Sequence, residues 1–179
     1  MNYCSQCGAS VIIKTPEGDE RPRYVCESCE TIHYQNPKIV VGVLPTWQDK
    51  ILFCRRAIQP RHGLWTLPAG FMENGETLEQ GACRETYEEA NAIVSNATLY
   101  TVISLPHISQ VYMMYRGEIE NGQHSPGIES LETRLLAVDE IPWDELAFRT
   151  IKKTLQCFVD DKASGNYPVH HLTIVPEDT

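Results

Sequence analysis

The sequence predicts an α/β fold built on a mixed sheet, preceded by a small cysteine-bearing ribbon. Three observations support this prediction. Two C-x-x-C pairs stand near the start of the 179-residue chain. From residue 38 onward, apolar and β-branched stretches alternate with turn residues. One glutamate-rich stretch and one amphipathic stretch have the spacing of helices. We therefore place the ribbon at residues 1–36 and the α/β domain at residues 37–179.

Composition limits the class of protein. Hydrophobic residues make up 42% of the chain, which is enough for a real core. No apolar run approaches the roughly 18 residues of a membrane span, and the N-terminus lacks the pattern of a signal peptide. We expect a cytoplasmic protein with no membrane partner. The net charge of −9 argues against nonspecific binding to nucleic acid, which depends on basic patches.

The two C-x-x-C knuckles are formed by Cys4, Cys7, Cys26 and Cys29. Their spacing is typical of a four-cysteine zinc ribbon, with residues 16–18 as the turn of an intervening hairpin. Because protein would fill all four positions, this zinc is expected to be structural. Two disulfides or a redox pair are the alternative. His33 follows closely, and we interpret it as a surface or hinge residue.

The first part of the α/β domain contains strands that lead to the glutamate-rich stretch. Residues 38–44 read as a buried strand, and residues 50–56 read as its partner across a turn at residues 48–49. A short extended segment, residues 64–67, ends at Pro68 and delivers the chain to Gly70.

The glutamate-rich stretch, residues 70–92, reads as a glycine-bearing loop that runs into a helix. Thr77 is a good N-cap, and Gln80 can complete a capping box, so the helix should run from there to about Ala90. At 100° per residue, three glutamates share one wedge beside the buried face of this helix: Glu85, Glu88 and Glu89.

Three carboxylates held this close repel one another and raise one another's pKa values unless a cation neutralises them. Hard oxygen ligands suit Mg²⁺ or Mn²⁺. The sequence therefore predicts a divalent metal on this wedge. The alternative is a solvated acidic helix face on which Arg84 and Glu88 form an ordinary i,i+4 pair.

The second half of the domain completes the sheet. The expected elements are strands at residues 97–105, 110–116 and 133–138, a polar loop at 120–127, a turn at 139–142 and an amphipathic helix at 148–162. The tail from Gly165 is expected to pack on the body of the domain or on a partner chain.

The spacing of Gly70, Glu76 and the run Arg84-Glu85-x-x-Glu88-Glu89 resembles the signature of the Nudix hydrolases. The resemblance implies a Nudix α/β/α sandwich whose loop and helix bind a divalent metal. It also implies hydrolysis of a nucleoside diphosphate linked to another group. The chain departs from the signature at Thr86, Asn91 and Ala92. Asn91 replaces the usual closing glycine, and asparagine tolerates the left-handed conformation well enough to end the helix.

The resemblance also implies roles for individual residues. Glu85, Glu88 and Glu89 would hold the metal, and the backbone carbonyl of Ala69 would complete its shell. Glu88 and Glu89 are also expected to be catalytic, because a carboxylate that is not bound to the metal would take the proton of the attacking water. Arg84 is expected to orient the glutamates.

Further site residues are expected outside the signature. A glutamate from a later loop often assists in this family; Glu129 and Glu132 are the candidates, and we prefer Glu132. Both read equally well as solvated loop charges. Arg55 and Arg56 point to opposite faces of their strand, so one of them can meet a phosphate. Trp65 is either a core aromatic or a platform for the base of a nucleotide.

Nearly the whole chain is similar to zinc-ribbon Nudix enzymes typified by plant ADP-ribose/FAD pyrophosphatases. This resemblance implies ADP-ribose and FAD as substrates and a homodimer. The alternative is the NADH pyrophosphatase and NAD-cap-removing branch, whose Ser-Gln-Pro-Trp-Pro-Phe-Pro motif is missing here. An ADP-ribose sensor and a nucleic-acid adaptor are the non-enzymatic alternatives, and the intact glutamates and the acidic charge weigh against both.

Overall fold

The computed structural model describes residues 1–176 and divides the chain into two compact units, Met1–Asn36 and a unit that begins at Pro37. The first unit is a three-stranded antiparallel sheet in the order β1-β2-β3. Its strands are β1 (Val11–Lys14), β2 (Arg23–Cys26) and β3 (Ile32–His33). No helix of the described residues is long and apolar enough to cross a membrane.

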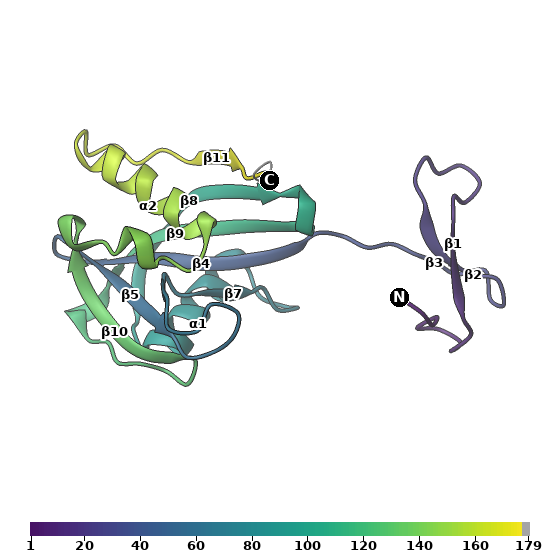
Figure 1. Cartoon of the computed structure of the whole chain (residues 1–179), viewed down its shortest axis with the longest axis horizontal. Helices are drawn as coiled ribbons and strands as arrows, with labels where there is room; N and C mark the ends of the chain where they lie inside the picture. Colours follow the sequence, from purple (N-terminus) through teal and green to yellow (C-terminus); the bar gives the residue numbers. More distant parts are fainter. Residues whose placement is uncertain (177–179) are drawn as a thin grey trace. The chain divides into compact units, whose positions relative to one another are not determined.

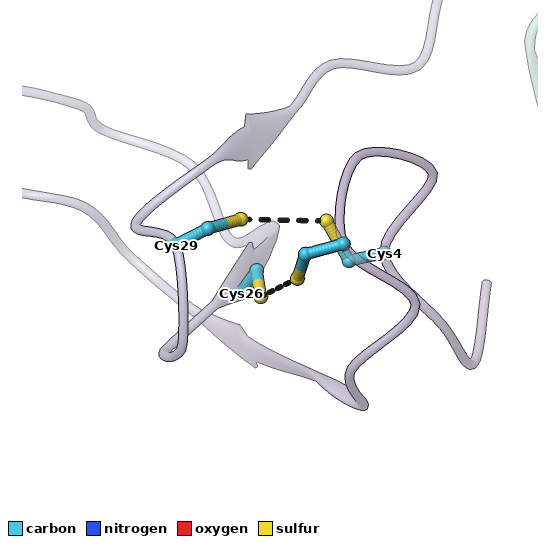
Figure 2. Close-up of side chains that lie close together, drawn as sticks. Cys4, Cys26 and Cys29 are labelled. Carbon is cyan, nitrogen blue, oxygen red and sulfur yellow. Dashed lines mark hydrogen bonds between the residues drawn. The ribbon is translucent and has the colours of Figure 1, made fainter.

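The four ribbon cysteines converge on one point. Their sulfur atoms all lie within 4.8 Å of one another. Cys4 Sγ is 3.6 Å from Cys29 Sγ (Figure 2), and Cys7 Sγ is 3.5 Å from Cys26 Sγ. A tetrahedral zinc site with Zn–S bonds of about 2.3 Å would separate its sulfurs by about 3.8 Å. The cysteines are all free, so this arrangement fits a metal and not the alternative of two disulfides.

His33 differs from the surface or hinge residue that we expected. It lies in β3, and its Nε2 atom is 3.3 Å from Cys4 Sγ. The imidazole therefore belongs to the surroundings of the thiolate cluster.

The second unit is an eight-stranded mixed sheet in the order β10-β5-β4-β9-β8-β11, with β6 paired to β5 and β7 paired to β4. The β4–β9 and β8–β11 pairs are parallel. The strands are β4 (Lys38–Trp47), β5 (Lys50–Arg56), β6 (Trp65–Thr66), β7 (Ala69–Phe71), β8 (Val94–Leu105), β9 (Gln110–Ile119), β10 (Ser130–Ala137) and β11 (His170–Thr173). The described connections contain four short 3-10 helices. Between strands lie η1 (Pro106–Ile108) and η2 (Glu120–Gly122), and between β10 and the following helix lie η3 (Val138–Glu140) and η4 (Trp143–Glu145).

Two helices cover the two faces of this sheet, so the predicted α/β/α sandwich is confirmed (Figure 1). On one face, α1 (Leu78–Ala90) buries Ala82 against Val41 and Val43 of β4. On the other face, α2 (Arg149–Lys162) packs its apolar side into the main core, which includes Leu44 and Phe53. The alternating side chains of β4 thus supply both cores.

The sheet opens between β4 and β5. These strands pair only next to their turn, at Thr46–Ile51 and Trp47–Lys50. Farther from the turn, β4 pairs with β7 and β5 pairs with β6. The segment from β6 to β7 is therefore inserted between two sequence-adjacent strands, and it ends in Ala69 and Gly70 beside α1.

The tail forms an element that the sequence did not predict. β11 extends the sheet by pairing in parallel with β8. Asp161, near the end of α2, accepts hydrogen bonds of 2.7 Å from the Tyr100 hydroxyl and from His170 Nε2, which ties the tail to the domain. The last three residues of the predicted tail lie outside the described range.

The ribbon geometry predicts one tightly bound zinc per chain. Because the small three-stranded unit has little apolar core of its own, the metal should supply much of its stability. Elemental analysis of freshly purified, reduced protein should find about one zinc per chain. The double variant Cys4→Ser/Cys26→Ser should lose the metal and lower the thermal stability of the ribbon. If elemental analysis finds no zinc in the purified protein, or if the double variant keeps the wild-type thermal stability, this account is contradicted.

Candidate active site

The loop and helix at residues 70–92 have the predicted ends. The Thr77 side chain accepts a hydrogen bond from the Gln80 backbone N–H, and the Gln80 side chain accepts one from the Thr77 N–H, so the capping box is confirmed. Asn91 ends α1 in the left-handed conformation, with φ 46° and ψ 30°. Gly70 makes room for the site, because a Cβ atom there would overlap the Glu85 carboxylate.

The three signature glutamates line one cleft of about 1570 Å³. Their environments differ. Glu89 is only 6% exposed, and its Oε2 atom is 3.4 Å from the backbone N–H of Ala69. The Glu85 side chain is 13% exposed, whereas that of Glu88 is 55% exposed. The alternative of a fully solvated acidic face therefore fails for Glu85 and Glu89.

Arg84 organises the outer part of this cluster. Its Nη1 atom lies 2.8 Å from Glu85 Oε1 and 3.0 Å from Glu88 Oε2. Its Nη2 and Nε atoms lie 2.9 and 3.0 Å from the two carboxylate oxygens of Glu76. The hydrogen bonds from Arg84 lower the pKa of Glu76 to about 2. Arg84 thus holds three carboxylates in place, as the orienting role requires.

Burial leaves the negative charge of the Glu89 carboxylate with too little positive charge nearby to balance it. Desolvation, helped by the nearby Glu85 charge, raises the pKa of Glu89 to about 8, although the Ala69 N–H and the Arg56 charge act in the opposite direction. Desolvation also raises the pKa of Glu85, which Arg84 partly offsets. A cluster of buried oxygen donors with too little positive charge is the environment that a divalent cation fits.

The geometry favours Glu129 over the preferred Glu132. Glu132 lies within β10 and not in a loop, and its carboxylate pairs with Arg134 and, at 3.9 Å, with Arg55. Glu129 lies in the loop before β10 and lines the cleft. The Glu129 charge contributes to the raised pKa values of Glu85 and Glu89, which line the same cleft.

The two arginines of β5 diverge as predicted. Arg56 lines the cleft, where its guanidinium lies 5.0 Å from the centre of the Phe148 ring and donates from Nε to the Pro60 carbonyl. Arg55 does not line the cleft; its Nε donates to the Gly63 carbonyl. Arg56 is therefore the arginine that can meet a phosphate.

Trp65 is a core residue and not a wall of the cleft. It is 5% exposed and belongs to the main core cluster, with the guanidinium groups of Arg55 and Arg134 over its ring. The aromatic side chains that do line the cleft are Phe71, Tyr112 and Phe148. Tyr112 and Phe148 read as ordinary members of a strand and a helix in the sequence, and only the fold brings them to the cleft.

The α/β/α sandwich, with the carboxylates of α1 held by Arg84 on the floor of a cleft, has the arrangement that the resemblance to Nudix hydrolases implied. Family comparison gives the same class. Residues 36–156 match the NUDIX domain family, and residues 2–35 match the zinc-ribbon family described as Nudix N-terminal. The chain belongs to the Nudix hydrolase family.

Curated relatives share this organisation in part. The chain is 32% identical over 141 residues to the NAD-capped RNA hydrolase NudC of Photobacterium profundum, covering 76% of this chain and 50% of the relative. It is 28% identical over 172 residues to the protein of the same name from Vibrio cholerae, covering 91% of this chain and 61% of that relative. The chain thus spans about half to three fifths of the length of these relatives.

One solved structure matches over almost the full chain. The crystal structure of a NUDIX hydrolase from Nitrosomonas europaea is 55% identical, with a TM-score of 0.95, and the match covers 98% of this chain and 100% of that one. A MutT NUDIX hydrolase from Burkholderia pseudomallei, 23% identical with a TM-score of 0.61, shares the fold over 68% of this chain and 98% of its own.

The raised pKa of Glu89 predicts a pH dependence of stability without divalent cations. An ordinary glutamate has a pKa of 4.5, whereas folded, metal-free protein holds the Glu89 proton up to about pH 8. The folded state therefore binds one more proton than the unfolded state between these values. As a result, the Glu89 contribution to the free energy of unfolding is largest below pH 4.5 and is lost as the pH rises through 8.

Glu89→Gln removes this titration. Urea unfolding between about pH 5 and pH 8, in buffer without Mg²⁺ or Mn²⁺, should show a shallower loss of stability in the variant than in the wild type. Parallel stability profiles for the two proteins would contradict the burial of an uncompensated carboxylate at this position.

Proposed function

We propose that the protein hydrolyses the pyrophosphate bond of a dinucleotide-type substrate, with Mg²⁺ or Mn²⁺ held by Glu85, Glu88, Glu89 and the backbone carbonyl of Ala69. The observation that carries this proposal is the buried, undercompensated Glu89 inside a large cleft. When bound, a divalent cation supplies charge neutralisation for phosphate oxygens and a lowered pKa for a coordinated water.

Three other residues of the cleft have separate roles in this proposal. Arg84 keeps the carboxylates of Glu85 and Glu88 in one geometry, so they need not reorganise as substrate binds. Arg56, at the end of β5, lines the same cleft and can bind the phosphates of the substrate through its guanidinium. Glu129 lies near Glu85 and Glu89 and is the carboxylate best placed to accept the proton of the attacking water.

The substrate proposal follows the curated relatives. Both carry the name NAD-capped RNA hydrolase, which favours NADH or an NAD-type end over the ADP-ribose and FAD that the resemblance implied. The net charge of −9 favours a small dinucleotide over a long RNA in the cleft. Homodimerisation stays a prediction.

ADP-ribose and FAD form the second candidate because of one specific observation. The seven-residue motif expected of the NADH-cleaving branch is missing. The connection from β8 through η1 to β9 contributes Leu105, His107 and Ile108 to the cleft. Different side chains in this wall would change which chemical group the cleft accepts in the half of the substrate that lies away from the glutamates.

A substrate panel tests both candidates. We expect kcat/KM for NADH to exceed that for ADP-ribose, FAD and nucleoside triphosphates at one Mg²⁺ concentration, with AMP among the products. NAD-capped RNA should be compared with uncapped RNA in the same series. A preference for ADP-ribose or FAD of about tenfold, or 1.4 kcal/mol in transition-state binding, would select the second candidate. Failure to hydrolyse any of these compounds would contradict the proposed function.

A further inference from the structure

The loop at residues 123–129 is fastened to the C-terminal end of α1. The Ser125 N–H donates to the Ala90 carbonyl at 2.8 Å, and the Gly127 N–H donates to the Glu89 carbonyl at 3.0 Å. These carbonyls belong to the last turn of α1, whose acceptors the helix itself cannot satisfy. The loop therefore caps the same turn that carries two of the signature glutamates.

The Asn91 side chain fastens the loop from the other direction. Its Nδ2 atom donates to the Ser125 carbonyl at 3.2 Å and to the Pro126 carbonyl at 3.3 Å. Helix α1 and the loop thus exchange hydrogen bonds in both directions around one residue. A glycine at this position would keep the left-handed conformation but would lack both side-chain bonds.

The contact is too close to leave freedom in the loop. A Cβ atom at Gly127 would overlap the backbone carbonyl of Glu88, so only glycine lets the loop approach the helix this far. The loop continues directly to Glu129, whose own carbonyl accepts a hydrogen bond of 2.8 Å from the Ala57 N–H. Anchors on both sides of Ile128 therefore fix where the Glu129 side chain enters the cleft.

We propose that Asn91 is a positioning residue, which locks the loop at residues 123–129 onto the end of α1 and thereby places Glu129 opposite Glu85 and Glu89. The inference rests on the proposed role of Glu129 in the hydrolysis. It assigns a purpose to the asparagine that replaces the closing glycine of the signature. In this chain the residue ends the helix and also aligns a carboxylate supplied by a distant segment.

A double-mutant cycle tests the inference. Asn91→Gly should preserve helix α1 and lower kcat about tenfold, in line with the loss of an outer support of a site. Glu129→Gln should lower kcat by at least as much. In the double variant, the second substitution should add little, because Asn91 acts through Glu129. Asn96→Gly is the matched control: Asn96 also has a positive φ, of 53°, but lies in β8 outside the residues that line the cleft.

Hydrogen exchange in protein without Mg²⁺ or Mn²⁺ gives a readout that is independent of turnover. Asn91→Gly should speed exchange at the Ser125 and Gly127 amides and leave the central amides of α1 protected. Asn96→Gly should change neither these amides nor kcat.

The outcomes separate the two claims. If Glu129→Gln lowers kcat but Asn91→Gly leaves kcat and the loop amides unchanged, the positioning role alone is wrong. Additive losses in the double variant would equally overturn it, because Asn91 would then act by another route. If Glu129→Gln has wild-type turnover, the proposed role of Glu129 falls and the inference falls with it.

Discussion

The structure depends on a cluster of partly buried carboxylates on the floor of a cleft, most of which are held by the guanidinium of Arg84. Arg84 forms hydrogen bonds with Glu76, Glu85 and Glu88, and the bond with Glu76 is the largest cause of its raised pKa, which burial alone would lower. None of the hydrogen bonds described for Arg84 is with Glu89. Glu89 is the most deeply buried of the signature glutamates, and its remaining deficit of positive charge is what a divalent cation relieves.

The scaffold brings three separate chain segments to this charge cluster. The opening between β4 and β5 inserts Ala69 and Gly70 beside the helix, and the missing side chain of Gly70 leaves space for Glu85. The loop before β10 docks on the last turn of α1 and adds Glu129. Arg56 approaches from the end of β5. The cleft thus combines a rigid acidic floor with walls that come from strands and loops, which is where specificity can vary without disturbing the floor.

Sequence reasoning succeeded where the determinants are local. The capping box at Thr77 and the left-handed end at Asn91 follow from short spacings, because the chain cannot place such residues far apart. The four cysteines were predictable because two C-x-x-C knuckles each supply two ligands to one metal site. The predictions were wrong where contacts between distant segments determine the direction of a side chain. A bulge at the start of β10 turns Glu132 toward Arg55 and Arg134, and the alternation of β6 directs Trp65 into the core. The pairing of β11 with β8 likewise joins segments about 70 residues apart, a contact with no local signal.

The central claim is that carboxylates of α1 hold a divalent cation that drives hydrolysis. The most direct measurement is the turnover of Glu89→Gln at saturating Mg²⁺, with Glu79→Gln as the control on an exposed position of the same helix outside the cleft. We expect the Glu89 variant to remain folded and to lose about a hundredfold or more in kcat, whereas the control keeps wild-type turnover. Near wild-type turnover of folded Glu89→Gln would contradict the account.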